Sequence, residues 1–230
     1  MSRIAIIPAR GGSKRIPRKN IKLFLGKPII AYSIAAAINS KLFDEVMVST
    51  DDEEIASIAK EYGARVPFYR STESATDYAT TVDVLLEVLS QYDSQGKHFD
   101  FGCCIYPSAP FSSKELFHRG YNKLVEEEHD VVFPALAYGH PIQRSFSLDP
   151  SNRIELFSKS EEFSRTQDLK TYYHDAGQFY WFNSQSLFIN KSLMKGKIAI
   201  LKVNSLEAHD IDEPSDWKMA EFKYKLLNKI

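Results

Sequence analysis

Short apolar runs alternate with amphipathic stretches along this chain. The apolar runs occupy residues 4–7, 45–49, 99–106, 130–134 and 198–203, and each has the length of a buried strand. Apolar residues recur at helical spacing over 27–39, 52–62, 80–89, 112–128 and 214–227. Strands that alternate with helices in this way predict an α/β fold with a doubly wound, mostly parallel sheet. In such folds the ligand lies beyond the carboxyl ends of the strands.

The pattern changes between about residues 135 and 175, where prolines, glycines and aromatic residues replace the helical period. Alternating pieces such as 153–157 predict a small β-rich insert within a single domain that spans residues 1–230. After the insert, residues 172–182 indicate one aromatic strand. Alternation along this strand would place Gln178 and Tyr180 on one face, able to line a pocket, and Phe179 and Trp181 on the other, packed face.

Charge and cysteine content narrow the class of protein. The chain has 29 lysines and arginines against 30 aspartates and glutamates, so no overall field favours nucleic acid or an anionic membrane as a partner. The two cysteines, Cys103 and Cys104, are adjacent and would point to opposite sides of a strand, which indicates free thiols in a reducing compartment. With no apolar run of signal-peptide or membrane-spanning length, we expect a soluble cytoplasmic protein.

Positive charge is concentrated in the loop that follows the first predicted strand. Residues 8–20 read PARGGSKRIPRKN, in which Gly11 and Gly12 stand among five cations: Arg10, Lys14, Arg15, Arg18 and Lys19. Like charges repel on a tight loop unless an anion lies among them, and a polyphosphate is the simplest such anion. The loop matches neither the P-loop nor the dinucleotide-binding pattern. A solvated loop with turn glycines is the alternative interpretation.

An acidic pair near the C-terminal end is the second candidate. Asp210 and Asp212 are two residues apart, so in an extended segment both carboxylates share a face while Ile211 points to the other side. Two neighbouring carboxylates suit Mg²⁺. The alternative is that Asp212 caps the closing helix, which would explain only one of the two aspartates.

The loop PARGGSKRIPRKN resembles the signature loop of the CMP-nonulosonate cytidylyltransferases, the enzymes that make CMP-activated sugar acids. The string YYHDAGQFYWF at 172–182 looks most like the pseudaminic acid branch, and the resemblance covers nearly the whole chain. It implies that CTP and a nonulosonic acid react to give the CMP-sugar and pyrophosphate. It also implies Mg²⁺ held by Asp210 and Asp212, and a homodimer formed through the 135–175 insert, which reaches towards the neighbouring subunit's site.

The resemblance also implies roles for individual residues. Lys19, Arg10 and Lys14 would be catalytic, holding the phosphates and stabilising the departing pyrophosphate. Nucleotide contacts are implied for Ala9, Arg10, Gly11, Gly12, Ser13, Lys14, Lys19, Asn20, Arg70, Asp77 and Thr80, and sugar contacts for Tyr106, Ser108, Arg165, His174, Gln178 and Tyr180.

Two sets of alternatives stay open. Tyr106 stands where CMP-sialate synthetases usually carry glutamine, which favours a less hydroxylated sugar, but sialate, legionaminate and Kdo are still possible acceptors. A protein of another class, a non-catalytic nucleotide sensor on the same fold, would bind CTP without releasing pyrophosphate.

Overall fold

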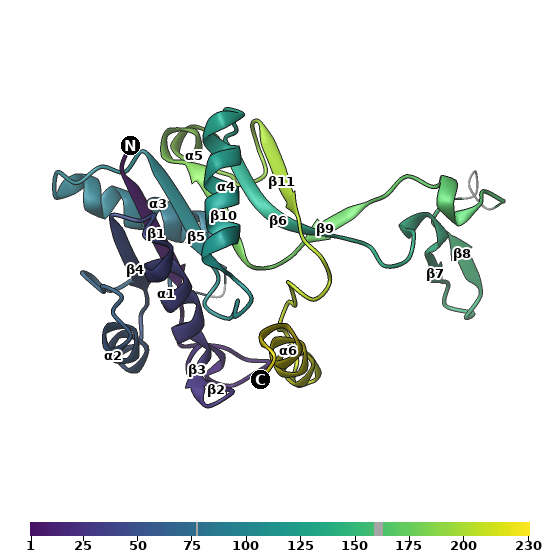
Figure 1. Cartoon of the computed structure of the whole chain (residues 1–230), viewed down its shortest axis with the longest axis horizontal. Helices are drawn as coiled ribbons and strands as arrows, with labels where there is room; N and C mark the ends of the chain where they lie inside the picture. Colours follow the sequence, from purple (N-terminus) through teal and green to yellow (C-terminus); the bar gives the residue numbers. More distant parts are fainter. Residues whose placement is uncertain (77, 159–162) are drawn as a thin grey trace.

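The core of the protein is a mixed sheet of seven strands, covered by helices on both faces (Figure 1). The computed structural model describes residues 1–76, 78–158 and 163–230. The strand order is β11-β6-β10-β5-β1-β4, and β9 pairs with β6. These strands are β1 (Arg3–Pro8), β4 (Glu45–Ser49), β5 (Phe101–Ile105), β6 (Val131–Ala137), β9 (Tyr173–Asp175), β10 (Phe179–Asn183) and β11 (Ile198–Lys202).

Strand direction confirms the predicted α/β fold and adds one feature. Strand β1 pairs in parallel with both β4 and β5, and β11 pairs in parallel with β6. Strand β10 runs antiparallel between β5 and β6. The predicted single strand at 172–182 is therefore two strands, because the chain turns at Gly177, where φ is +63°.

Helices pack on both faces of the sheet and make each face a separate apolar core. Helices α1 (Ile29–Ser40), α2 (Glu53–Glu61) and α4 (Lys114–Glu126) contribute to one core, and α3 (Thr81–Ser94) and the short α5 (Ser184–Asn190) contribute to the other. Phe179 and Trp181 of β10 enter the first core, whereas Tyr180 and Phe182 enter the second. The predicted alternation is correct, but both faces are packed.

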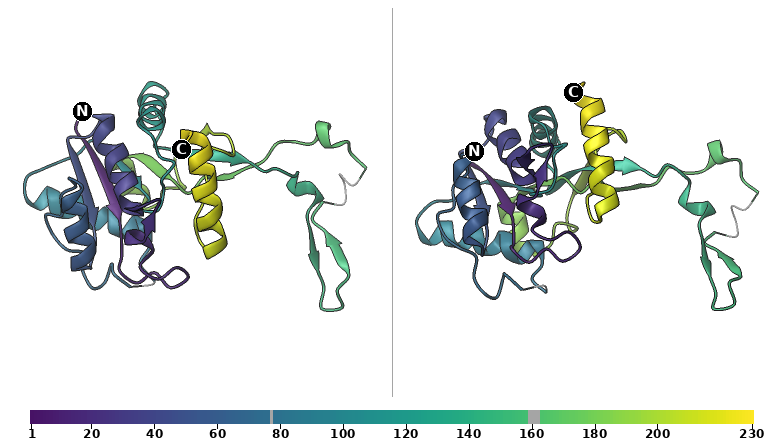
Figure 2. Two further views of the ribbon diagram at one scale, coloured as in Figure 1. Left: turned by 60° about the horizontal axis from the view of Figure 1, so that its bottom comes forward. Right: turned by 90° about the horizontal axis from the view of Figure 1, so that it is seen from below.

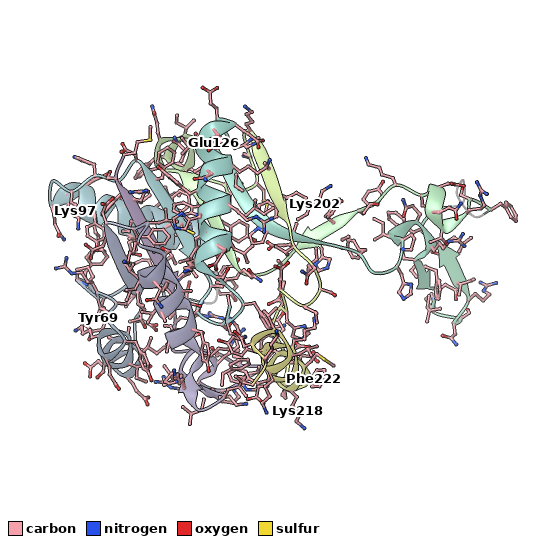
Figure 3. All side chains as sticks on the ribbon, viewed as in Figure 1. Tyr69, Lys97, Glu126, Lys202, Lys218 and Phe222 are labelled. Atoms are coloured by element: carbon pink, nitrogen blue, oxygen red, sulfur yellow. The ribbon has the colours of Figure 1, made fainter. Side chains whose placement is uncertain are left out.

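The closing helix α6 (Pro214–Asn228) packs beside the basic loop. It shares a third apolar cluster with the segment that runs from the loop through η1 (Lys19–Ile21), β2 (Leu23–Phe24) and β3 (Lys27–Pro28) into α1. Ile16, Phe24, Ile211 and Trp217 are buried in this cluster. The outer side of α6 is exposed, and Lys218 and Phe222 point away from the body there (Figure 3).

Residues 138–158 and 163–172, here called the arm, project from the body beyond β6 and β9 (Figures 1 and 2). The arm contains η2 (Ile142–Arg144), the hairpin of β7 (Phe146–Leu148) and β8 (Ile154–Leu156), and η3 (Thr166–Asp168). Among the described residues, no helix has both the length and the apolar character needed to cross a membrane.

Two local details complete the fold. Residues 64–70 follow α2 as an extended piece, in which Arg65 forms an isolated parallel bridge to Met47 of β4. Ile38 of α1 is 40 % exposed, although helical periodicity alone would place it on the apolar stripe of that helix.

Candidate functional site

The basic loop and the acidic pair meet in space although they lie at opposite ends of the sequence. Lys19 Nζ donates a hydrogen bond to the carbonyl oxygen of Ile211 at 2.7 Å and lies 3.8 Å from Asp212 Oδ1. Arg15 Nη2 is 2.8 Å from the same carboxylate oxygen. The contact between Lys19 and Ile211 spans 192 positions of sequence, so it is a product of the tertiary fold.

The acidic segment is anchored by Ile211, which is 1 % exposed and packs in the third cluster. The residues on either side of it therefore point away from that cluster. The N-cap of α6 is Glu213, which forms a capping box with Asp216; Asp216 Oδ2 accepts the amides of Asp212 at 3.0 Å and Glu213 at 2.7 Å. The alternative in which Asp212 caps the helix is wrong, and its carboxylate faces Arg15 and Lys19 instead.

A cleft of about 520 Å³ lies beyond the carboxyl ends of β1 and β5, where the sheet topology predicts a ligand. Asn20, which is 5 % exposed, closes the turn of the loop by donating from Nδ2 to the carbonyl oxygen of Arg10 at 3.0 Å. Ala9 is fully buried and donates its amide to Ser49. The cleft is lined by Pro8, Arg10, Ser13, Lys14, Arg15, Ile16, Lys19, Asn20, Pro107, Ser108 and Asp212.

A second pocket of about 260 Å³ shares Pro8 and Arg10 with this cleft. Arg70 is fixed in it by hydrogen bonds from Nη2 to the Ser49 carbonyl oxygen (2.8 Å) and from Nε to Ser49 Oγ (3.2 Å). Burial lowers the pKa of the Arg70 guanidinium. The second pocket is lined by Pro8, Arg10, Arg70, Ser74, Thr76, Ala79, Thr80, Thr81, Val84 and Tyr106.

Thr80 is the N-cap residue of α3. Its hydroxyl and the Asp83 carboxylate form a capping box at the start of α3. Because Thr80 also lines the second pocket, a contact with a ligand would be additional to capping. Asp77, also predicted to contact the nucleotide, lies outside the described residues.

The charged groups in and beside the cleft shift one another's pKa values. Burial lowers the pKa of Lys19, and this lowering is opposed by the nearby carboxylates of Asp212 and Asp210. Burial raises the pKa of Asp210, and the negative charge of Asp212 raises it further. Asp175, at the end of β9, also has a raised pKa, caused by burial and by the charge of Asp210. Sequence reasoning missed Asp175, whose only signal is an acidic residue at the end of a short aromatic segment.

The acidic pair has the donor chemistry for a divalent cation. Two carboxylates whose mutual repulsion raises the pKa of one of them would be stabilised by a dication. In the part of the chain that the structure describes, no three His, Cys, Asp or Glu side chains are grouped so as to hold a metal by themselves. Mg²⁺ takes one or two protein carboxylates and fills its remaining positions with water and substrate phosphates, so two neighbouring aspartates have the chemistry that this ion needs.

Arg18 differs from the other cations of the loop. It adopts a left-handed backbone conformation (φ 54°) and forms ion pairs with Asp52 and Glu54 at the start of α2. The guanidinium holds the pKa of Asp52 at about 2. A Cβ on Gly11 would lie 2.7 Å from Asp52 Oδ2, so a side chain at that position would displace this carboxylate or the loop. The first acids of α2 therefore fix the shape of the loop.

The residues predicted to contact the sugar are dispersed. Ser108 lines the main cleft, but Tyr106 lines the second pocket. Gln178 and Tyr180 are 1 % and 5 % exposed, so the prediction that their face of the strand lines an open pocket was wrong. Gln178 is buried with its amide bonded to the Glu207 carbonyl oxygen, and Tyr180 packs in the second core. His174 is exposed on β9, with its ring 4.9 Å from that of Tyr138. Arg165 lies on the arm, exposed and paired with Asp168 at 2.8 Å.

Comparisons with a family model, with related sequences and with solved structures each match nearly the whole chain. A family model described as "Cytidylyltransferase" matches residues 4–214. A pseudaminic acid cytidylyltransferase of Campylobacter jejuni is 41 % identical over 226 residues, which cover 98 % of this chain and 97 % of that protein. A CMP-N,N'-diacetyllegionaminic acid synthase of Legionella pneumophila is 34 % identical over 227 residues, covering 95 % and 94 %. The structure of a CMP:2-keto-3-deoxy-manno-octonic acid synthetase complexed with CTP has the same fold, with a TM-score of 0.72 over the full length of both chains at 17 % identity.

Proposed function

Because this chain belongs to the cytidylyltransferase family, we propose that it couples CTP to a nonulosonic acid, with pseudaminic acid as the acceptor. The products are the CMP-sugar and pyrophosphate. The observation that carries the proposal is the contact of Lys19 with the acidic segment, which brings the cations of the basic loop and the Asp212 carboxylate to one cleft. The choice of pseudaminic acid is supported by the greater identity to the Campylobacter jejuni enzyme than to the legionaminate synthase.

The reaction is an in-line displacement at the α-phosphorus of CTP. The anomeric hydroxyl oxygen of the sugar acid forms the new P–O bond and its proton is released to solvent, while the bond between the α-phosphorus and the bridging oxygen breaks and pyrophosphate leaves. Catalysis of this kind is mainly positioning and charge neutralisation. In our proposal Arg10, Lys14 and Lys19 hold the triphosphate in the main cleft and stabilise the charge that builds on the pyrophosphate.

The second pocket suits the nucleoside. It opens beside Arg10, so a triphosphate in the main cleft would carry its ribose and base towards Arg70 and Thr80. Arg70 is already held by Ser49 and offers a fixed donor to a pyrimidine carbonyl. The loop residues Gly11, Gly12, Ser13 and Asn20 would supply backbone and amide donors near the phosphates.

We assign Mg²⁺ to Asp210 and Asp212. When bound, the ion would neutralise phosphate charge and polarise the α-phosphate. Arg15 and Lys19, which contact Asp212 in the structure, would then turn from this carboxylate towards the phosphate oxygens. The sugar acid would lie against Ser108 and Tyr106 on the proline-bounded ledge after β5, with His174 at its outer side.

A homodimer would complete the site. Four apolar side chains of the arm are between 57 % and 69 % exposed, namely Phe146, Leu148, Ile154 and Phe157. An apolar group of this size on a projecting arm supports docking onto a second copy of the chain. Arg165 would then reach the neighbouring subunit's sugar site and bind the acceptor carboxylate. The two buried, unpaired thiols and the CTP substrate support a cytoplasmic location.

The test is pyrophosphate release from CTP and Mg²⁺ with each of four acceptors: pseudaminic, legionaminic, N-acetylneuraminic and Kdo acids. We expect pseudaminic acid to give the highest kcat/KM, with the CMP-sugar identified by mass spectrometry and Asp212→Asn as the inactive control. Faster turnover of another acid would reassign the acceptor. The absence of pyrophosphate release with every acid would reject the proposed function.

A further inference from the structure

The start of β10 is tied to the acidic segment by a buried amide. Gln178 is 1 % exposed, and its Nε2 donates to the carbonyl oxygen of Glu207 at 2.6 Å. The backbone carbonyl of Gln178 accepts the amide of Tyr106 at 2.8 Å. This residue therefore connects the central strands of the sheet to the segment that carries Asp210, three positions after Glu207.

Gly177, the preceding residue, lies directly against Asp210. A Cβ at this position would lie 3.0 Å from Asp210 Cγ and 3.1 Å from Oδ1. The residue also has a φ of +63°, which L side chains rarely adopt. Its amide donates to Asp175 Oδ1 at 2.8 Å, which fixes the turn between β9 and β10. The turn thus supplies a flat surface on which the Asp210 carboxylate rests.

The acidic segment needs such support because its carboxylates repel one another. Asp210 lies within the field of both Asp212 and Asp175, and residues 204–206 before it are exposed. Lys19 holds the Ile211 carbonyl, and Lys223 of α6 holds the Ser205 and Ala208 carbonyls. These contacts come from the loop and from α6, whereas Gln178 connects the segment to the start of β10 in the sheet.

We propose that Gln178 and Gly177 are positioning residues that hold the Asp210 carboxylate in place to receive the cation. The inference deepens the proposed function, since it rests on Asp210 and Asp212 binding Mg²⁺ with CTP. It assigns to Gln178 a role through the acidic segment rather than contact with the sugar. Groups that orient a metal ligand without touching the metal commonly change metal affinity by 10- to 100-fold when removed.

Gln143 provides a matched control. It is also a buried glutamine, 5 % exposed, whose Nε2 donates to a backbone carbonyl, that of Lys170, at 2.9 Å. In both glutamines Oε1 has no partner among the described residues. Gln143 lies on the arm. Gln143→Met therefore removes the same kind of hydrogen bond, from a buried amide to a backbone carbonyl, as Gln178→Met does, but at a place that does not contact the acidic segment.

The experiment measures the affinity for Mn²⁺, as a spectroscopic substitute for Mg²⁺, by electron paramagnetic resonance with CTP bound and no sugar acid present. Thermal melts show that each variant is folded at the temperature used. We expect Gln178→Met to weaken Mn²⁺ binding about 10- to 100-fold and Gln143→Met to leave it within about twofold of wild type. Gly177→Ala, which adds a methyl group against Asp210 and keeps the Gln178 amide, should weaken Mn²⁺ binding as well.

Several results would overturn the inference. It fails if Gln178→Met and Gln143→Met lower the melting temperature alike and leave Mn²⁺ affinity equally unchanged. If Gln178→Met does not fold, Gly177→Ala decides, and wild-type affinity in that variant rejects the positioning role. Because no acceptor is present, these outcomes are separate from the failure of the proposed function, which would show as absence of CMP-sugar from a wild type that binds Mn²⁺ and CTP normally.

Discussion

Lys19 is the residue on which the proposed chemistry most depends, and Lys19→Met removes its charge at nearly constant length. The ammonium lies 3.8 Å from Asp212 Oδ1 and donates to Ile211 at 2.7 Å. Two unit charges at this separation attract by about 4 kcal/mol at an effective dielectric constant of about 20, and by less where solvent screens them. Phosphate oxygens in the cleft would replace these partners at similar distances.

The expected kinetic effect follows from this magnitude. If the Lys19 ammonium interacts fully only with the charge that develops on the leaving pyrophosphate, its loss should cost about 3–4 kcal/mol of transition-state stabilisation, or 100- to 1000-fold in kcat. The KM for CTP should change less, because ground-state binding is shared with the other cations of the loop. Arg15→Met is the matched control: Arg15 contacts the same carboxylate but is 65 % exposed, so its loss should cost less than about tenfold.

The assay is the initial rate of pyrophosphate release at saturating CTP, Mg²⁺ and sugar acid, followed from neutral to alkaline pH. Burial lowers the pKa of Lys19, so the charged form is lost at a lower pH than for an ordinary lysine. The wild-type rate should therefore fall on the alkaline side, and this fall should be absent from the residual activity of Lys19→Met. A variant that keeps more than about one third of the wild-type kcat would refute the role given to Lys19.

Three further predictions concern the loop and the second pocket. Gly11→Ala places a methyl group 2.7 Å from Asp52 Oδ2, whereas the methyl group of Gly12→Ala meets nothing within 4 Å. Gly11→Ala should therefore lower the melting temperature and raise the KM for CTP, and Gly12→Ala should change neither. Equal effects of the two variants would contradict the packing. Asp52→Asn keeps a good helix cap but removes the charge paired with Arg18. Because the pKa of Asp52 is lowered from 3.8 to about 2, the charge stabilises the folded state above pH 4 and this contribution disappears as the pH falls towards 2. Urea unfolding should show a loss of about 1 kcal/mol at pH 7 that narrows below pH 4, and a loss independent of pH would exclude the ion pair as its cause. Arg70→Met should raise the KM for CTP by about 10- to 100-fold with little change in kcat, as expected for loss of a uniform binding contact; a fall in kcat at constant KM would place Arg70 at the reacting atoms instead.

Local pattern was sufficient to predict the secondary structure around the site. The strand at residues 45–49 was predicted to the residue, since a short β-branched run bounded by polar residues has few other structures available. Helix α2 begins and ends within a residue of its prediction, because Asp52 caps it and Gly63 follows it. Which distant elements these strands and helices pair or pack with is not encoded in such a local pattern. The insertion of β10 antiparallel between β5 and β6 could not be inferred from periodicity, which is the same in either strand direction.

The sequence by itself determined that a cationic glycine loop follows the first strand and that two aspartates share a face near the C-terminal end, because both are short-range patterns. Only the tertiary structure decided that these two regions meet, since the contact between Lys19 and Ile211 depends on α6 packing against the loop. The structure also decided which charges are engaged elsewhere. Arg18 is paired with Asp52, and Gln178 is buried against the acidic segment rather than exposed to a sugar. Burial and ion pairing depend on which elements cover a residue, and that is settled when the sheet and its helices assemble.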